Sequence, residues 1–220
     1  MTIQRISLTG HSFNGLGPIG EYLTINTDQG SIDCLYIANG RKNDAVIWAG
    51  SWSGENRISP IARNTALLLL AKGINSLIIK YRKSRELPSS SMDTEAGVLF
   101  LENQGHSRIS LVGHSFSGAV VITTGPLRKS IASVVALASQ TYGARSAREL
   151  SPRPLLLIHG TNDERLDVYC SEQIYSWAKQ PKELLILEGS SHSLKEHLEI
   201  VVAKLENWIP QSLNNKSTIS

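Results

Sequence analysis

The succession of apolar and polar positions along the 220-residue chain predicts a hairpin followed by a buried sheet. Residues 22–27 and 31–37 alternate between apolar and polar side chains, and Asp28-Gln29-Gly30 separates them. This arrangement is typical of two half-buried strands joined by a tight turn. Residues 45–49 form a continuous apolar run, which indicates a strand that is covered on both faces.

From residue 59 onward, helical patterns alternate with short apolar runs. The first helix is expected to begin with Ser59 as its N-cap and Pro60 at its first position, and to stop at Gly73. The remaining elements are predicted as strands at 74–80, 109–112, 133–139, 154–159 and 182–188, and as helices at 93–103, 119–124, 168–179 and 193–208. A hairpin followed by strand–helix repeats favours an α/β fold with parallel strands.

The most informative stretch of the chain is residues 108–118. Its strand is followed by the sharp turn Gly113-His114-Ser115-Phe116-Ser117-Gly118 and then by a helix that Gly125-Pro126 stops. A strand, a tight turn with a serine at its tip and a helix together describe a nucleophile elbow. The helix N-terminus behind Ser115 also favours negative charge near the serine oxygen.

Two motifs near the N-terminus look functional but lack the context they need. Residues 5–15 repeat the elbow segment except at Thr9 and Asn14, yet the following residues 16–20 cannot continue as a helix. Ser12 is therefore interpreted as an exposed turn residue. Residues 15–20 also spell G-x-G-x-x-G, but a strand follows where a dinucleotide site needs a helix.

Composition and charge narrow the class of protein. Hydrophobic residues make up 41% of the chain and charged residues 19%, and the net charge of +3 supports neither nucleic-acid nor membrane-surface binding. No apolar run approaches the length of a transmembrane helix. The cysteines Cys34 and Cys170 are too few for a disulfide framework, so a cytoplasmic protein is expected. We expect one domain over residues 1–209, with its core from about residue 21, and a polar tail over 210–220.

The elbow segment resembles the G-x-S-x-G signature of the α/β-hydrolase superfamily. The sequence departs from that signature at Ser117, which replaces the second glycine, and Gly118 follows one place later. The resemblance extends over residues 21–209. It implies an α/β-hydrolase fold with a mostly parallel eight-stranded sheet and helices on both faces.

In this superfamily the nucleophile is followed along the chain by an acid and then by a histidine. Residues 159–163 resemble the H-G-x-x-D loop that carries the acid, and residues 188–192 resemble the loop that carries the base. The resemblance thus implies a catalytic triad of Ser115, Asp163 and His192. Each lies just beyond a predicted strand, at the edge of the sheet where ligands bind.

Each assignment has neighbours of the same chemical type. Glu164 and Asp167 lie near Asp163, but the H-G-x-x-D register selects Asp163, and Asp167 is more simply the N-cap of the next helix. His197 is expected within the last helix and not in the loop. His114 and His159 flank strand ends, where a structural role is the simpler interpretation.

The resemblance also implies an oxyanion hole made of two backbone N–H groups. One belongs to Phe116, the residue after the nucleophile. The other comes from the loop of residues 50–54, where Trp52 is preferred over Ser51. Residues 140–152 are too few for a lid domain, so the chain resembles the small lidless esterases, thioesterases and dienelactone-hydrolase-like proteins.

These features predict a serine hydrolase that cleaves a carboxylic ester or thioester of a small molecule, with no metal and no cofactor. Two alternatives remain: a small-molecule-binding protein without turnover, and an acyltransferase. Arg82 and Arg85 follow the fourth strand and are candidates for binding an anionic part of the substrate, although a charge cluster is usually a solvated face. The substrate itself and the oligomeric state are not indicated.

Overall fold

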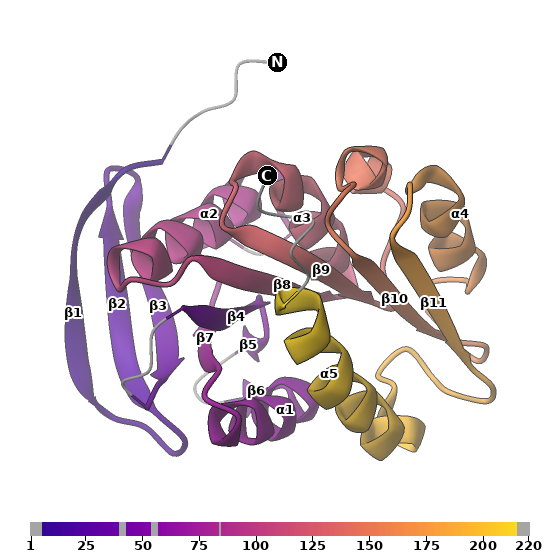
Figure 1. Ribbon diagram of the computed structural model, residues 1–220, viewed down its shortest axis with the longest axis horizontal. Helices are drawn as coiled ribbons and strands as arrows, with labels where there is room; N and C mark the ends of the chain where they lie inside the picture. The colour runs from indigo at the N-terminus through magenta and orange to yellow at the C-terminus, as the bar shows by residue number, and fades with distance from the viewer. Residues whose placement is uncertain (1–5, 40–42, 54–56, 84, 215–220) are drawn as a thin grey trace.

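The computed structural model in Figure 1 describes residues 6–39, 43–53, 57–83 and 85–214. A sheet of nine strands runs through the middle, in the order β1-β2-β3-β7-β4-β8-β9-β10-β11. Its strands are β1 Leu8–Leu16, β2 Glu21–Thr27, β3 Gly30–Ile37, β4 Asp44–Ala49, β7 Asn75–Ile79, β8 Arg108–His114, β9 Ile131–Leu137, β10 Leu155–Gly160 and β11 Lys182–Leu187. The first three strands are antiparallel to their neighbours, and all pairs from β7 to β11 are parallel.

Helices cover both faces of this sheet, as Figure 1 shows. On one face lie α1 Pro60–Ala71 and α5 Leu198–Leu213, and on the other lie α2 Leu87–Asn103, α3 Phe116–Thr124 and α4 Tyr169–Trp177. Each face has its own apolar core, with Trp48 among the side chains beneath α1 and α5 and Phe100 among those on the opposite face. Because both faces are covered, the inner parallel strands β7, β4, β8, β9 and β10 are buried over almost their whole length, whereas the edge strand β11 is mostly half-buried. The predicted α/β class is confirmed.

The sequence pattern predicts eight strands, and β1, the first strand along the chain, is additional to them. Its side chains are exposed along almost the whole strand, so it lacks the alternation that identified β2 and β3. Gly10 and Gly15 lie within it, and the pairing with β2 shifts its register near both. Ser12 is therefore a strand residue and not a turn residue, although it remains exposed and has no helix behind it.

Helices α2 and α5 differ most in extent from the sequence prediction, and α5 begins at Leu198 and not at residue 193. Helix α2 begins at Leu87 and not at residue 93, with Pro88 in its first turn, where a missing N–H costs nothing. Helix α5 continues through Pro210 to Leu213 because its end is buried: the Ser212 hydroxyl donates to the Ile209 carbonyl, and its oxygen lies 2.8 Å from Ser133 Oγ. Only part of the predicted tail is described, since residues 215–220 lie outside the described ranges.

Candidate active site

The predicted elbow is present between β8 and α3. Ser115 adopts φ 58° and ψ −121°, a conformation that non-glycine residues rarely occupy. Its backbone N–H donates to the Leu137 carbonyl at the end of β9, at 2.8 Å. The neighbouring strand therefore holds the strained residue in place, and α3 begins immediately behind it.

The small residues around Ser115 are required by close packing. A Cβ on Gly113 would lie 2.1 Å from the Ser117 carbonyl oxygen, and one on Gly118 would lie 2.6 Å from Ser139 Oγ. The departure from the superfamily signature at Ser117 is accommodated by Gly50, which has φ +60° and whose Cβ would lie 2.5 Å from Ser117 Oγ. The side chain that Ser117 adds thus occupies space that position 50 leaves empty.

The structure brings the three predicted triad residues together. The Ser115 Oγ lies 2.9 Å from His192 Nε2, and His192 Nδ1 lies 2.7 Å from Asp163 Oδ2. The side chain of His192 is 7% exposed and that of Asp163 is fully buried. Because a carboxylate faces Nδ1, that nitrogen carries the proton, and the lone pair on Nε2 faces the serine hydroxyl. This is the tautomer that can accept the serine proton.

The Asp163 carboxylate accepts hydrogen bonds on both oxygens. Oδ1 accepts from the backbone N–H groups of Arg165 at 2.8 Å and Leu166 at 2.9 Å, while Oδ2 accepts from His192 and His159. Burial pushes the pKa of Asp163 upward, but the bonds from Leu166, His192 and Arg165 outweigh it and lower the pKa below its ordinary value. Asp163 is therefore held as a carboxylate.

His159 is a further hydrogen-bond partner of the Asp163 carboxylate. Its Nε2 lies 3.0 Å from Asp163 Oδ2 and 3.0 Å from the Leu166 carbonyl, and its Nδ1 lies 2.7 Å from Ser171 Oγ. Two acceptors at Nε2 require a proton there, so in the neutral ring the Ser171 hydroxyl donates to Nδ1. The interpretation of His159 as a structural residue is consistent with these contacts.

The loop that carries His192 is held by charged side chains. The Glu196 carboxylate accepts from the backbone N–H of Ser191 at 3.0 Å and from its hydroxyl at 2.9 Å. The bond from the Ser191 backbone is the main reason that the pKa of Glu196 is lowered to about 2. Glu164, the sequence neighbour of Asp163, accepts from the backbone N–H of His192 at 3.1 Å. Sequence reasoning considered Glu164 only as a rival acid and missed this contact.

The other two rivals lie apart from the triad contacts. Asp167 lies one position before Val168, the N-cap of α4, so the prediction that Asp167 is the N-cap is wrong, although its carboxylate accepts from the Tyr169 N–H at 2.8 Å. His197 ends a short 3-10 helix, Lys195–His197, and is the N-cap of α5, so the prediction that it lies within the last helix is wrong. Among the described residues, no group of three His, Cys, Asp or Glu side chains is arranged to bind a metal.

The candidate oxyanion donors lie beside the elbow. Phe116 is the first residue of α3, where backbone N–H groups lack an acceptor within the helix. Ser51 and Trp52 follow β4, whose last residue pairs with Gly113. Trp52 begins the two-residue strand β5 Trp52–Ser53, which pairs with β6 Arg57–Ile58. Both Ser51 and Trp52 remain candidates, and Gly54 of the same loop lies outside the described residues.

A cavity of about 400 Å³ opens beside His114, the residue before Ser115. It is lined by residues after β4, by residues at the start of α1 and by the neighbour of Ser115, namely Gly50, Ser51, Arg57, Ile58, Ser59, Pro60 and His114. Between β9 and β10 the chain forms only the short 3-10 helix Ala144–Glu149, so no lid domain is inserted there. The cavity thus lies close to the predicted triad, although none of the three triad residues lines it.

The basic residues after β7 are arranged differently from a ligand site. Arg82 Nε lies 2.6 Å from Asp93 Oδ1, and the Asp93 side chain is fully buried. Arg82 Nη1 also donates to the Gln29 carbonyl, so protein contacts account for this guanidinium without a substrate. Arg85 is exposed and has φ 64°. The structure thus gives Arg82 a structural partner, while Arg85 stays a prediction.

Comparisons with known proteins agree with this architecture. A model of the family described as platelet-activating factor acetylhydrolase, isoform II, matches residues 97–220, a range that contains Ser115, Asp163 and His192. The uncharacterized protein YfhR of Escherichia coli O157:H7 is 28% identical over 178 residues, which are 65% of this chain and 63% of that protein. The chain therefore spans less than two thirds of the length of this relative.

Two solved structures illustrate the similarity in fold. Est1E from Butyrivibrio proteoclasticus has a TM-score of 0.74 and 15% identity, covering 87% of this chain and 98% of that one. Dienelactone hydrolase from Anabaena variabilis has a TM-score of 0.75 and 18% identity, covering 91% and 98%. The predicted α/β-hydrolase fold is thereby confirmed. Within the described part of the chain, every helix is too short or too polar to span a bilayer.

Proposed function

Since the chain belongs to the family of platelet-activating factor acetylhydrolase, isoform II, we propose that it is a serine hydrolase of carboxylic esters or thioesters. The observation that carries the proposal is the chain of contacts from Ser115 Oγ through His192 to the Asp163 carboxylate, at 2.9 Å and 2.7 Å. It lies at the carboxyl edge of the parallel strands, beside an open cavity. The described acetylhydrolase activity of the family also supports a short acyl group.

The mechanism follows from the geometry. His192 Nε2 takes the proton of Ser115 as its oxygen attacks the acyl carbonyl, and the Asp163 carboxylate stabilises the imidazolium that forms. The negative charge on the former carbonyl oxygen is stabilised by the N–H of Phe116 and by a second donor, Trp52 or Ser51. His192 then protonates the leaving group, and an acyl-enzyme remains on Ser115. Water that His192 deprotonates releases the acid and restores the serine.

Two other functions use parts of the same site. A binding protein without turnover has no need for a strained serine whose hydroxyl contacts the unprotonated nitrogen of a buried histidine, so the contacts favour an enzyme. An acyltransferase forms the same acyl-enzyme and differs only in the acceptor that replaces water. Ester hydrolysis in water without an added alcohol or amine acceptor supports the hydrolase, whereas acyl transfer only to an added acceptor supports the alternative.

Labelling with a fluorophosphonate probe tests the assignment of the nucleophile. The probe should form its adduct on Ser115, and Ser115→Ala should abolish both labelling and ester hydrolysis. Ser12→Ala is the matched control because Ser12 lies in a nearly identical local sequence but in an exposed strand, and this variant should behave like the wild type. An adduct on Ser12, or an unlabelled wild-type protein, would contradict the proposal.

A further inference from the structure

The backbone N–H and the backbone carbonyl of His192 each contact a side chain, and each of these side chains belongs to a sequence neighbour of another triad residue. Glu164 follows Asp163 and accepts from the His192 N–H, while His114 precedes Ser115 and contacts the His192 carbonyl. We propose that His114 and Glu164 are positioning residues that together fix the imidazole of His192 between Ser115 and Asp163. The inference rests on the proposed function and adds two residues to it.

The first contact anchors the base to the loop that carries the acid. Glu164 Oε2 lies 3.1 Å from the backbone nitrogen of His192, although the Glu164 side chain is 61% exposed. An ionised acceptor makes this hydrogen bond stronger than one between neutral groups. The same contact is the largest cause of the lowered pKa of Glu164, so the carboxylate is the form that the fold favours.

The second contact anchors the base to the elbow. His114 Nε2 lies 2.8 Å from the His192 carbonyl oxygen, so this nitrogen donates a proton. The ring centroids of the two histidines are 4.9 Å apart. Burial is the main reason that the pKa of His114 is lowered, which keeps the ring neutral beside the imidazolium that His192 becomes during catalysis. His114 thus holds His192 without opposing its charge.

These two contacts matter because His192 has no regular structure to support it. It lies in the loop between the end of β11 at Leu187 and the short 3-10 helix that begins at Lys195. A catalytic group must be held to within about 0.5 Å of its productive position. Since each anchor is adjacent in sequence to Ser115 or Asp163, any shift of one loop is transmitted to the other two. The two bonds therefore set the register among all three loops.

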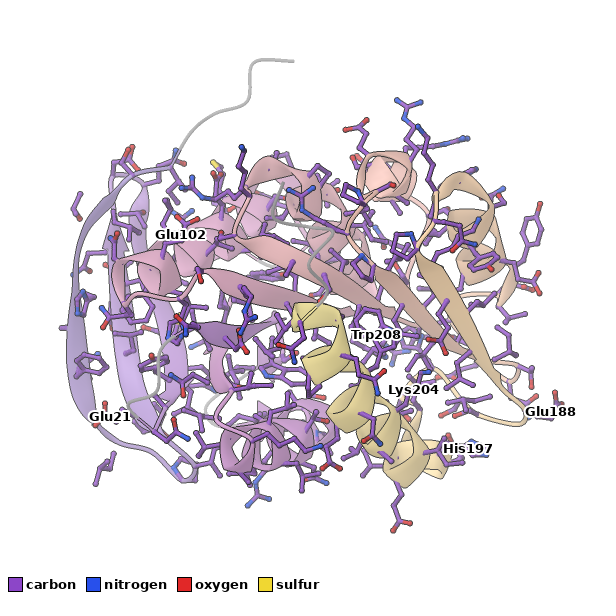
Figure 2. The ribbon with its side chains drawn as sticks, in the orientation of Figure 1. Glu21, Glu102, Glu188, His197, Lys204 and Trp208 are labelled. Atoms are coloured by element: carbon purple, nitrogen blue, oxygen red, sulfur yellow. The ribbon has the colours of Figure 1, made fainter. Side chains whose placement is uncertain are left out.

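Paired variants separate the hydrogen bonds from general packing. His114→Ala and Glu164→Ala remove the donor and the acceptor, while His114→Gln and Glu164→Gln keep a donor and an acceptor at similar reach. Glu188→Ala is the matched control, because Figure 2 shows this carboxylate at the outer end of the same loop, pointing away from the protein. Rates of ester hydrolysis, rates of fluorophosphonate labelling and Tm are measured for each variant.

The alanine variants should lower kcat by about tenfold to a hundredfold, the effect of misplacing a catalytic group by roughly 1 Å. KM should change little, and the glutamine variants should recover most of the loss. The double alanine variant should lose less than the product of the two single losses, since both bonds hold one residue. Alanine variants as active as Glu188→Ala would overturn the inference. Equal losses in the alanine and glutamine variants, accompanied by a lower Tm, would overturn it as well.

Hydrogen exchange at the His192 amide tests the contact without relying on catalysis. Exchange should be slow in the wild type and in Glu164→Gln, and faster in Glu164→Ala. Unchanged exchange in Glu164→Ala would overturn the role of Glu164 even in an active enzyme. A wild-type protein that resists the fluorophosphonate would instead refute the proposed function, and the exchange result would still report on the anchor.

Discussion

Replacing Arg82 by leucine should destabilise the protein strongly, because it leaves a buried carboxylate without its cation. Asp93 is fully buried and accepts from Arg82 twice, from the backbone N–H at 2.9 Å and from Nε at 2.6 Å. Removing one partner of a buried ion pair costs about 3–5 kcal/mol of unfolding free energy. The variant also loses the bond from Arg82 to the Gln29 carbonyl. This loss is a large fraction of the roughly 5–15 kcal/mol by which a typical domain is stable.

The loss should depend on pH in a defined direction. Burial raises the pKa of Asp93 even though the bonds from Arg82 lower it, so the folded state holds this proton to a higher pH than the unfolded chain does. The contribution of Asp93 to stability is therefore greatest below its unfolded pKa of about 3.9 and falls as pH rises through the folded value. Without Arg82 the folded pKa rises further, and the variant should suffer more at about pH 8 than at about pH 5.

Urea unfolding of the wild type and Arg82→Leu at both pH values measures these differences. The double variant Arg82→Leu/Asp93→Leu is the control, since replacing both partners by apolar residues is often neutral or stabilising. It should recover most of the lost stability and show a weaker dependence on pH. A loss below about 1 kcal/mol at the higher pH, the value of an exposed pair, would refute the reasoning. So would a loss of equal size at both pH values.

Three further predictions concern the site itself. Gly50→Ala should lower the unfolding free energy by about 1–3 kcal/mol and also reduce kcat/KM, because its Cβ would lie 2.5 Å from Ser117 Oγ at a φ of +60°; unchanged urea unfolding would contradict this. The pKa of Asp163 is lowered in the folded state, so its contribution to stability is present above about pH 4 and is lost as pH falls through the folded pKa. Acid unfolding of the wild type compared with Asp163→Asn measures this contribution. For p-nitrophenyl esters from acetate to palmitate, kcat/KM should level off beyond short chains, because half-covered methylenes gain far less than about 0.8 kcal/mol each. A steady rise toward palmitate would show that the acyl chain is deeply buried.

Much of the fold follows from local patterns that the sequence displays directly. The hairpin of β2 and β3 has its alternation and its Gly30 turn, and each parallel strand contains a short apolar run. The sequence pattern does not predict strand β1, because its side chains are exposed and it contains two glycines. These features are typical of an exposed edge strand and not of a core strand. The sequence pattern predicts the start of helix α2 too late because the first turns of the helix are rich in serine. Helix propensity alone does not assign serine to helices.

The site also contains features that the sequence predicts and contacts that it does not. Ser115, Asp163 and His192 are carried by motifs whose residues are adjacent in sequence, so their placement was predictable and the structure brings them together. The contacts of Glu164 and His114 with the backbone of His192 join loops that are far apart in the chain. Such contacts depend on how the strands are ordered in the sheet, and one sequence without its fold contains no pattern that reveals them.

The separation of the proposed triad along the chain has a consequence for folding. Ser115 and His192 are 77 positions apart, and the strands β8, β9, β10 and β11 must all be paired before their side chains meet. Forming such distant contacts is slow, since the chain loses loop entropy before it gains the contact. A partly folded molecule therefore carries an inert serine. During refolding, reactivity of Ser115 toward a fluorophosphonate should return only when β11 has paired with β10. Labelling of this proposed nucleophile should therefore report when the sheet is complete.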